Sequence, residues 1–108
     1  MIIEHDIVEK KYCPIIRPTE LLGDTWTLLI IKELLEEPLR FNKIKDKIPE
    51  ITNRTLSARL KKLVSNKVIE RNLLEGSPPK VEYNLTQMGY GLKPVLREIE
   101  DFGNKFMC

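Results

Sequence analysis

Two short amphipathic helical patterns lie next to each other in the middle of the chain, with only residues 49–51 between them. In residues 40–48, apolar side chains recur at spacings of three and four until Pro49 ends the pattern. The second pattern begins after Thr52, a good helix cap, and continues to about Ser65, where Asn66 is expected to close the helix in a left-handed conformation. Two helices joined by so short a turn predict a helix-turn-helix over about 40–66. The apolar stripe of the second helix consists of Leu56, Leu60, Leu63 and Val64.

The periodicity of the sequence changes from helical to alternating directly after this segment. Val81, Tyr83 and Leu85 alternate with polar residues, while residues 68–74 are rich in side chains that favour strands. Residues 75–79 between them contain glycine, serine and two prolines, as turns do. The pattern predicts a two-stranded wing over about 68–86. A helix-turn-helix followed by a wing is a winged helix, so the expected fold class is mainly α with a small β-hairpin (α+β).

Further helices are expected on both sides of this unit, at 18–22, 25–36 and about 87–107. The last of these carries an apolar stripe that includes Phe102 and Phe106, which a chain of 108 residues can hardly cover by itself. We therefore expect a homodimer that forms through the terminal helices. Residues 1–12 are predicted to be an N-terminal arm or dimerisation segment, and residues 13–108 the winged-helix domain.

Positive charge is concentrated in the same central segment. The chain has a net charge of only +2, but residues 40–80 contain eleven basic and four acidic residues, a net +7, while the segments before and after are acidic. A basic surface of this kind favours a polyanionic partner such as double-stranded DNA. The alternative interpretation is an ordinary solvated surface.

The helix at about 53–65 presents a basic face opposite its apolar stripe. Arginine can recognise guanine in the major groove, and short side chains such as Ala58 allow close approach to base edges. Lysines further along the helix, and one near the wing tip, are placed to contact phosphates. Arg40 and Arg71 are left out of the predicted set because they could equally pair with Glu50 or Glu70. The predicted DNA-binding residues are Asn53, Arg54, Thr55, Ser57, Ala58, Lys61, Lys62 and Lys80.

Five short segments stand in a characteristic order along the chain: Cys13-Pro14, LGDTWTLLI at 22–30, RFN at 40–42, ITNRTLSARL at 51–60 and VEYNLT at 81–86. In these segments, and over roughly Cys13 to Gly103, the chain resembles the HxlR-type winged-helix transcriptional regulators, which are related in architecture to the MarR group. The resemblance implies a homodimer whose two winged helices bind the half-sites of a palindromic operator. Two departures are visible: Asn66 and Lys67 replace the usual glycine turn, and Phe102 stands where tryptophan is frequent.

The resemblance also implies a second role for Cys13, because some members of the family sense oxidants or electrophiles at this position. The alternative is a small buried side chain in a dimer interface. An oxidant or a small molecule is accordingly a candidate effector. Two other interpretations of the whole chain are a winged-helix module for protein interaction and a thiol sensor whose DNA binding is secondary.

Other classes of function find little support in the sequence. No set of nucleophile, base and orienting residue can be assembled, and no glycine-rich phosphate loop is present, so we expect no enzyme and no catalytic residues. The two cysteines and the single histidine form no cluster, which predicts no metal and no cofactor. The longest aliphatic run has four residues and no secretory signal pattern precedes it, so we expect a cytoplasmic protein without a membrane partner.

Overall fold

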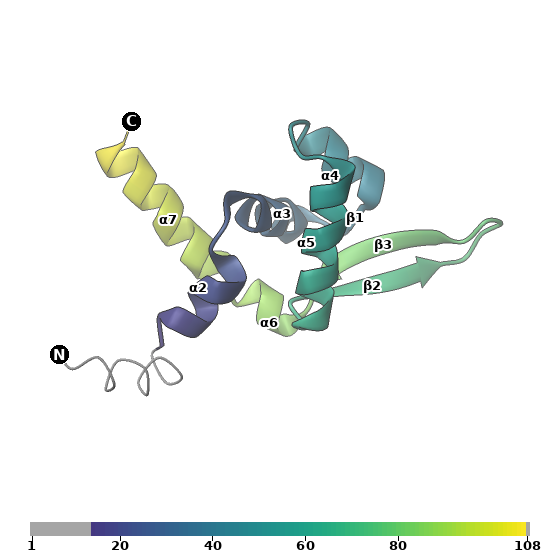
Figure 1. Cartoon of the computed structure of the whole chain (residues 1–108), viewed down its shortest axis with the longest axis horizontal. Coiled ribbons are helices and arrows are strands. Elements are labelled where there is room, and N and C mark those ends of the chain that lie inside the picture. The colour runs from purple at the N-terminus through teal and green to yellow at the C-terminus, as the bar shows by residue number, and fades with distance from the viewer. Residues whose placement is uncertain (1–13, 108) are drawn as a thin grey trace.

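The structure is a computed structural model and describes residues 14–107. The predicted N-terminal arm and Cys13 lie outside the described residues. Helices and a small sheet alternate along the chain (Figure 1). In chain order the elements are α2 (Ile16–Leu22), α3 (Thr25–Glu36), β1 (Leu39–Arg40), α4 (Phe41–Lys47), α5 (Asn53–Ser65), β2 (Ile69–Leu74), β3 (Lys80–Leu85), α6 (Gln87–Tyr90) and α7 (Lys93–Phe106).

The core lies where α3, α4 and α5 pack against one another and against the base of the sheet. The apolar stripe predicted for α5 is confirmed, because Leu56, Leu60 and Leu63 are buried and Val64 is half-buried against them. The fully buried side chains of α3 recur at spacings of three and four, at Thr27, Ile30, Ile31 and Leu34, and therefore share one face of the helix. Burial of these side chains holds α5 against the domain and leaves its opposite face to solvent. The α3 and α4 residues in this cluster are Ile30, Ile31, Leu34 and Ile44.

The turn between α4 and α5 is short and tightly bonded. Thr52 caps α5 as predicted, its hydroxyl oxygen accepting a hydrogen bond from the backbone N–H of Thr55 at 3.1 Å. The ammonium group of Lys45 donates to the carbonyl oxygen of Ile51 at 2.5 Å, and the Ile51 side chain is buried. These contacts fix the angle between the two helices of the helix-turn-helix.

The end of α5 differs from the prediction by one residue. Asn66 has a φ of −92° and is not left-handed; Lys67 takes the left-handed conformation instead, with a φ of 63°. The backbone N–H of Lys67 donates to the carbonyl of Val64, and that of Val68 donates to the carbonyl of Leu63, both at 3.0 Å. This pair of bonds is a Schellman closure, which requires the left-handed residue directly after the last helical cap position. Asn66 is that cap, so the prediction placed the reversal one residue too early.

The wing is confirmed, but it belongs to a three-stranded antiparallel sheet in the order β1-β3-β2. β2 and β3 pair from Ile69 opposite Leu85 to Leu74 opposite Lys80. The third strand, β1, was not predicted: it is two residues long and pairs Leu39 with Tyr83. Two residues are too few to produce a recognisable alternating pattern.

One C-terminal helix was predicted over about 87–107, but the structure divides it into α6 and α7. Thr86 caps the first part as expected, accepting from the backbone N–H of Gly89 at 3.1 Å. Gly89 packs so closely on the carbonyl of Val68 that a Cβ would collide with it. Pro94 has no N–H to continue the helix across Gly91, and α7 begins in a new direction. Figure 1 shows α7 and the wing extending from opposite ends of the molecule. Among the described helices, none is both long enough and apolar enough to cross a membrane.

Candidate nucleic-acid interface

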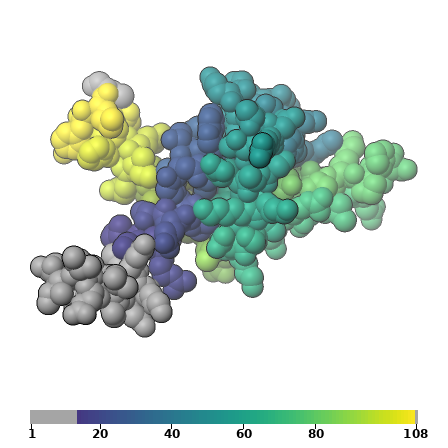
Figure 2. Space-filling model, viewed as in Figure 1, coloured from purple at the N-terminus to yellow at the C-terminus, as the bar shows by residue number. Residues whose placement is uncertain are grey.

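α5 lies on the surface of the molecule, and the wing projects beside it (Figure 2). Its predicted DNA-binding side chains are accessible except at Thr55, which is half-buried near the helix start. This exposure follows from the apolar stripe, because burying Leu56, Leu60 and Leu63 turns the opposite side of the helix outward. The exposed predicted residues of α5 are Asn53, Arg54, Ser57, Ala58, Lys61 and Lys62.

A groove of 660 Å³ separates this face of α5 from the strands of the wing. It brings together four of the predicted residues, namely Arg54, Ser57, Ala58 and Lys61. Two basic side chains with small residues between them therefore line one side of the groove. Such a surface can accept a phosphate backbone and bring short side chains close to base edges.

Arg71 of β2 lies on the opposite side of the same groove, together with Tyr83 of β3. The two residues face each other across the strands in the register of the hairpin. Arg71 forms no ion pair with Glu70 within residues 14–107; the Glu70 carboxylate instead accepts from the side-chain amide of Asn84 at 3.1 Å. Strand alternation places Arg71 on the same side as Ile69, which is buried beneath α5. That alternation was the sequence signal for an arginine in the groove, and the prediction did not use it.

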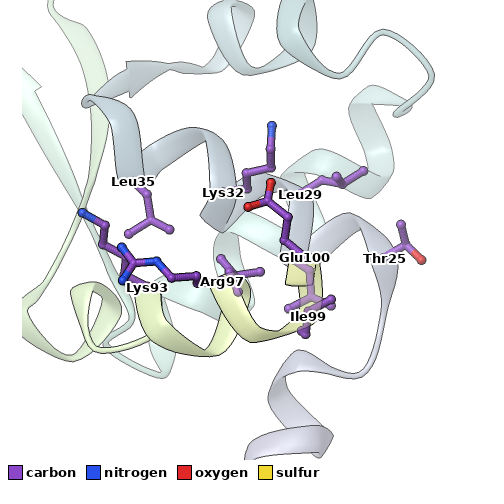
Figure 3. Close-up of a pocket in the computed structure, with 10 residues that line it drawn as sticks. Thr25, Leu29, Lys32, Leu35, Lys93, Arg97, Ile99 and Glu100 are labelled. Atoms are coloured by element: carbon purple, nitrogen blue, oxygen red, sulfur yellow. The ribbon is translucent and has the colours of Figure 1, made fainter. Parts of the chain in front are cut away.

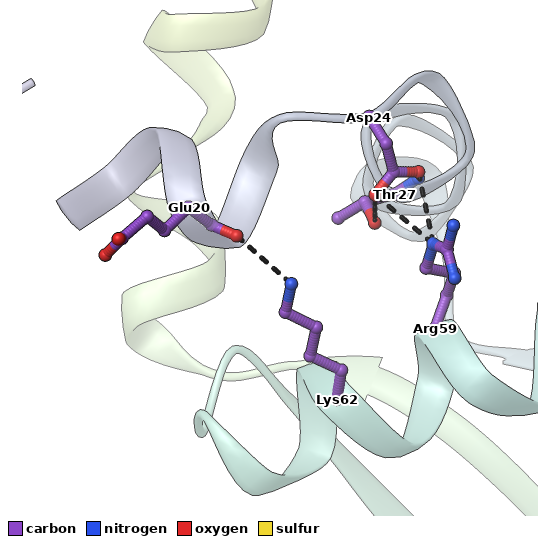
Figure 4. Close-up of polar contacts among 5 residues, drawn as sticks. All are labelled: Glu20, Asp24, Thr27, Arg59 and Lys62. Carbon is purple, nitrogen blue, oxygen red and sulfur yellow. Dashed lines mark hydrogen bonds and ion pairs between the residues drawn. The ribbon is translucent and has the colours of Figure 1, made fainter. Parts of the chain in front are cut away.

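Lys62 lies apart from the groove. Its ammonium group donates to the carbonyl oxygen of Glu20 in α2 at 3.1 Å (Figure 4). Adjacent residues on a helix are separated by about 100°, so Lys62 is directed toward α2 while Lys61 faces the wing. The sequence pattern predicted a phosphate contact for both lysines, because it contains no information on the position of α2.

Arg59, one turn before Lys62, connects α5 to the start of α3. Its Nε lies 3.2 Å from each carboxylate oxygen of Asp24. Asp24 also caps α3, accepting from the backbone N–H of Thr27 at 3.0 Å and from the Thr27 hydroxyl at 2.8 Å (Figure 4). Burial raises the pKa of Asp24, but the hydrogen bonds from Thr27 and Arg59 and the Arg59 charge outweigh it, so the pKa is held below its ordinary value. The ionised carboxylate therefore both caps α3 and binds α5 through Arg59.

The remaining predicted residues lie at the two ends of this surface. Asn53 and Thr55 are in the first turn of α5, and Lys80 is the exposed first residue of β3, opposite Leu74 and next to the wing turn. Arg40 precedes α4 and forms no ion pair with Glu50 in the described part of the chain. No group of three histidine, cysteine or acidic residues within 14–107 is arranged to hold a metal ion.

The sequence is similar to those of known helix-turn-helix proteins. A model of the family described as HxlR-like helix-turn-helix matches residues 21–108. The HTH-type transcriptional regulator YodB of Bacillus subtilis is 41% identical over 86 residues, which cover 80% of this chain and 77% of YodB.

Solved structures agree with the sequence match. The reduced form of YodB is similar with a TM-score of 0.78 at 38% identity, covering 88% of this chain and 94% of that one. Structures of diamide-treated and quinone-bound YodB give TM-scores of 0.74 and 0.75. The redox regulator HypR in its oxidised form gives 0.82 at 28% identity, covering 89% and 99% of the two chains. A MarR-family regulator from Porphyromonas gingivalis gives 0.82 at 33% identity, covering 88% and 93%.

Proposed function

Because the chain belongs to the HxlR-like helix-turn-helix family of transcriptional regulators, we propose that it binds double-stranded DNA in a sequence-specific way through the groove between α5 and the wing. The observation that carries this proposal is the convergence of Arg54 and Lys61 with Arg71 on the two sides of one groove. The three cations come from two different elements, α5 and β2. We also propose that the protein acts in the cytoplasm, together with its DNA target.

In this arrangement α5 enters the major groove with its N-terminal half toward the bases. Arg54 is placed to donate to a guanine, while Ser57 and Ala58 let the helix approach the base edges. Lys61 and Arg71 contact the phosphates that border the groove. Lys80, near the wing tip, contacts the backbone or the minor groove alongside.

A second copy of the chain is the proposed partner of α7. One side of this helix exposes large apolar side chains: Val95 is 43% exposed, Ile99 49%, Phe102 57% and Phe106 65%. The Phe102 and Phe106 rings are 5.1 Å apart and form a continuous apolar surface. A two-fold dimer would bury this surface and place two α5 helices about one turn of DNA apart, ~34 Å, on a palindromic operator.

The experiment that tests the proposal is selection of bound fragments of genomic DNA by the purified full chain. The best fragment is then titrated against random DNA at several salt concentrations. We expect enrichment of a two-fold site and a log affinity that falls steeply with log salt concentration. Absence of enrichment, with binding that does not depend on salt, would contradict DNA recognition and favour a winged-helix module for protein interaction.

A redox response at Cys13 is a second proposal, which the diamide-treated and quinone-bound structures of the relative YodB favour. Basic neighbours in the sequence, Lys10, Lys11 and Arg17, would stabilise a thiolate at Cys13. The test is operator binding before and after diamide treatment. We expect the wild type and Cys108→Ser to respond and Cys13→Ser not to respond. An unchanged response in Cys13→Ser would remove this proposal while leaving DNA binding intact.

A further inference from the structure

The wing exposes an apolar surface that is separate from the one on α7. On α7, Ile99 is exposed and also lines a pocket against α3 (Figure 3), so that surface and the pocket adjoin. This part of the molecule is the proposed contact with a second copy. On the wing, Leu73 is 68% exposed, and Val81, which is half-buried, lies opposite it. Leu73 and Val81 form the wing-end surface.

Strand alternation places the wing-end surface on the side of the hairpin that faces α5. In the register of β2 and β3, every second residue pair points to the same side of the sheet. The first pair on this side, Ile69 with Leu85, is buried in the core, and the second pair lines the groove beside α5. Leu73 and Val81 are the third pair. The apolar side of the wing therefore extends beyond the groove, toward the turn of the hairpin.

The other side of the hairpin is polar, and its side chains bond to one another. The side-chain amide of Asn84 donates to the carboxylate of Glu70 at 3.1 Å, and the amide of Asn72 donates to the side-chain oxygen of Asn84. Residues of both strands take part in this network, which therefore supports the register of the hairpin. Within the wing strands, Leu73 is the large apolar side chain that is mostly exposed, and it lies on the side that faces α5.

The proposed DNA complex brings a minor groove to the wing-end surface. A phosphate backbone that lies between α5 and the wing separates the major groove, in which α5 lies, from the neighbouring minor groove. The end of the wing therefore faces that minor groove. Cations flank the surface, since Arg71 is two residues before Leu73 on the same side and Lys80 is next to Val81. An apolar centre with positive charge on both sides is complementary to a minor groove between two rows of phosphates.

We propose that Leu73 packs into this minor groove and selects A·T over G·C base pairs there. The inference rests on the proposed function and adds a base preference that comes from an apolar side chain of the wing. Proteins that bind the minor groove use apolar side chains in this way. A G·C pair displays the amino group of guanine in the minor groove, whereas an A·T pair has no donor there. Leu73 covers that amino group without offering it an acceptor, which is unfavourable.

The test measures binding of the full chain to variants of its selected operator. Base pairs that flank the part contacted by α5 are changed singly from A·T to G·C and to inosine·cytosine. Inosine presents the same major-groove pattern as guanine but lacks the amino group in the minor groove. At the positions next to the wing, we expect the wild type to bind A·T and inosine·cytosine operators equally. The G·C operators should bind about threefold to tenfold more weakly.

Two alanine variants of neighbouring leucines separate this contact from a general effect on the wing. Leu73→Ala should lower operator affinity by about threefold to tenfold and remove the penalty for G·C. The slope of log affinity against log salt should not change, because leucine carries no charge. Leu74→Ala is the matched control, since it removes the same atoms from the opposite side of the hairpin, where Leu74 pairs with Lys80. It should retain the affinity and the penalty for G·C.

Three results would overturn the inference: a G·C penalty that persists in Leu73→Ala, inosine·cytosine operators that bind as weakly as G·C, or the same losses in Leu74→Ala. Light scattering identifies the competing occupant. If Leu73→Ala changes the mass of the chain in solution and not the penalty for G·C, the wing-end surface contacts a second copy instead. A salt-dependent operator complex without a G·C penalty would contradict only this inference, whereas failure to select any operator would contradict the proposed function as well.

Discussion

Arg59 on the recognition helix α5 and Asp24 at the start of α3 are joined through one guanidinium nitrogen that lies 3.2 Å from both carboxylate oxygens. Asp24 is at the same time the cap of α3. Orientation of the DNA-binding helix therefore depends on the same carboxylate that begins a helix of the core.

Replacing Asp24 by alanine should destabilise the fold, because both the cap and the partner of Arg59 are lost. We expect the free energy of unfolding to fall by about 1–2 kcal/mol. Asp24→Asn retains an acceptor for Thr27 and should cost less. Urea denaturation of both variants measures this, with Glu37→Ala, an exposed position after α3, as the control. Asparagine keeps the acceptor and loses only the charge, so equal losses in the alanine and asparagine variants would contradict a contribution of the neutral cap.

The contribution of the Asp24 charge should depend on pH in the acid range. Its pKa in the folded chain is lower than its ordinary value of 3.8, so the ionised form stabilises the fold at pH above that value. This stability is lost as the pH falls through the lowered pKa of the folded state. The difference in unfolding free energy between wild type and Asp24→Asn should thus be constant near neutral pH and shrink below 3.8. A difference that grows on acidification would have the wrong sign for this contact.

Arg54→Ala should relax recognition at one position of the operator. We expect a loss of about 1–3 kcal/mol on the preferred base pair and a much smaller loss on its substitutes, since arginine would contact one base. Binding to a set of operators that differ at single positions measures this. An equal loss on the operator and on random DNA would assign Arg54 to a phosphate instead.

Lys61 and Lys62, although adjacent, should behave differently. Lys61→Ala should lower the slope of log affinity against log salt by about one, because one phosphate contact is lost. Lys62→Ala should leave that slope unchanged, because its ammonium group is bonded to the Glu20 carbonyl. Salt titrations of both variants on one operator serve as mutual controls. A reduced slope in Lys62→Ala would mean that this side chain leaves α2 when DNA binds.

Phe102→Glu should dissociate the proposed dimer, because it places a charge in the centre of the exposed apolar surface of α7. Asn104→Glu adds the same charge to the same helix at an exposed polar position and should leave the dimer intact. Light scattering after size exclusion gives the mass of each variant. Monomers in the wild type, or equal effects of both changes, would refute this interface.

Much of the fold could be predicted because it depends on local patterns. The α5 stripe, the caps at Thr52 and Thr86 and the alternation of the wing strands are all properties of neighbouring residues. β1 and the close packing of α6 on the start of β2 were not predicted, because they depend on contacts between distant segments. β1 exists only as a partner of β3, and Gly89 marks a packing contact with Val68.

The part of the candidate site that lies on α5 could be predicted, but the contacts of its side chains with α2 and β2 could not. Rotation about the axis of α5 predicted that Arg54, Ala58, Lys61 and Lys62 share one outward face, and the first three of these line the groove. Lys62 was predicted to contact DNA but bonds to α2, and Arg71 was left out of the predicted set but lines the groove. Both positions depend on where a neighbouring element lies. Rotation along one helix gives no information about such neighbours.

The residue before the wing and the residue after it are hydrogen-bonded to each other. Thr86, just after β3, donates its hydroxyl to the carbonyl of Lys67 at 2.6 Å, and Lys67 is the left-handed residue between α5 and β2. This hydrogen bond therefore holds the end of β3 against the connection between α5 and β2. The pairing of β3 with β1 and the buried side chains of Ile69 and Leu85 also hold this end of the hairpin, so the position of Lys80 relative to Arg54 is set at the base of the wing and not at its tip.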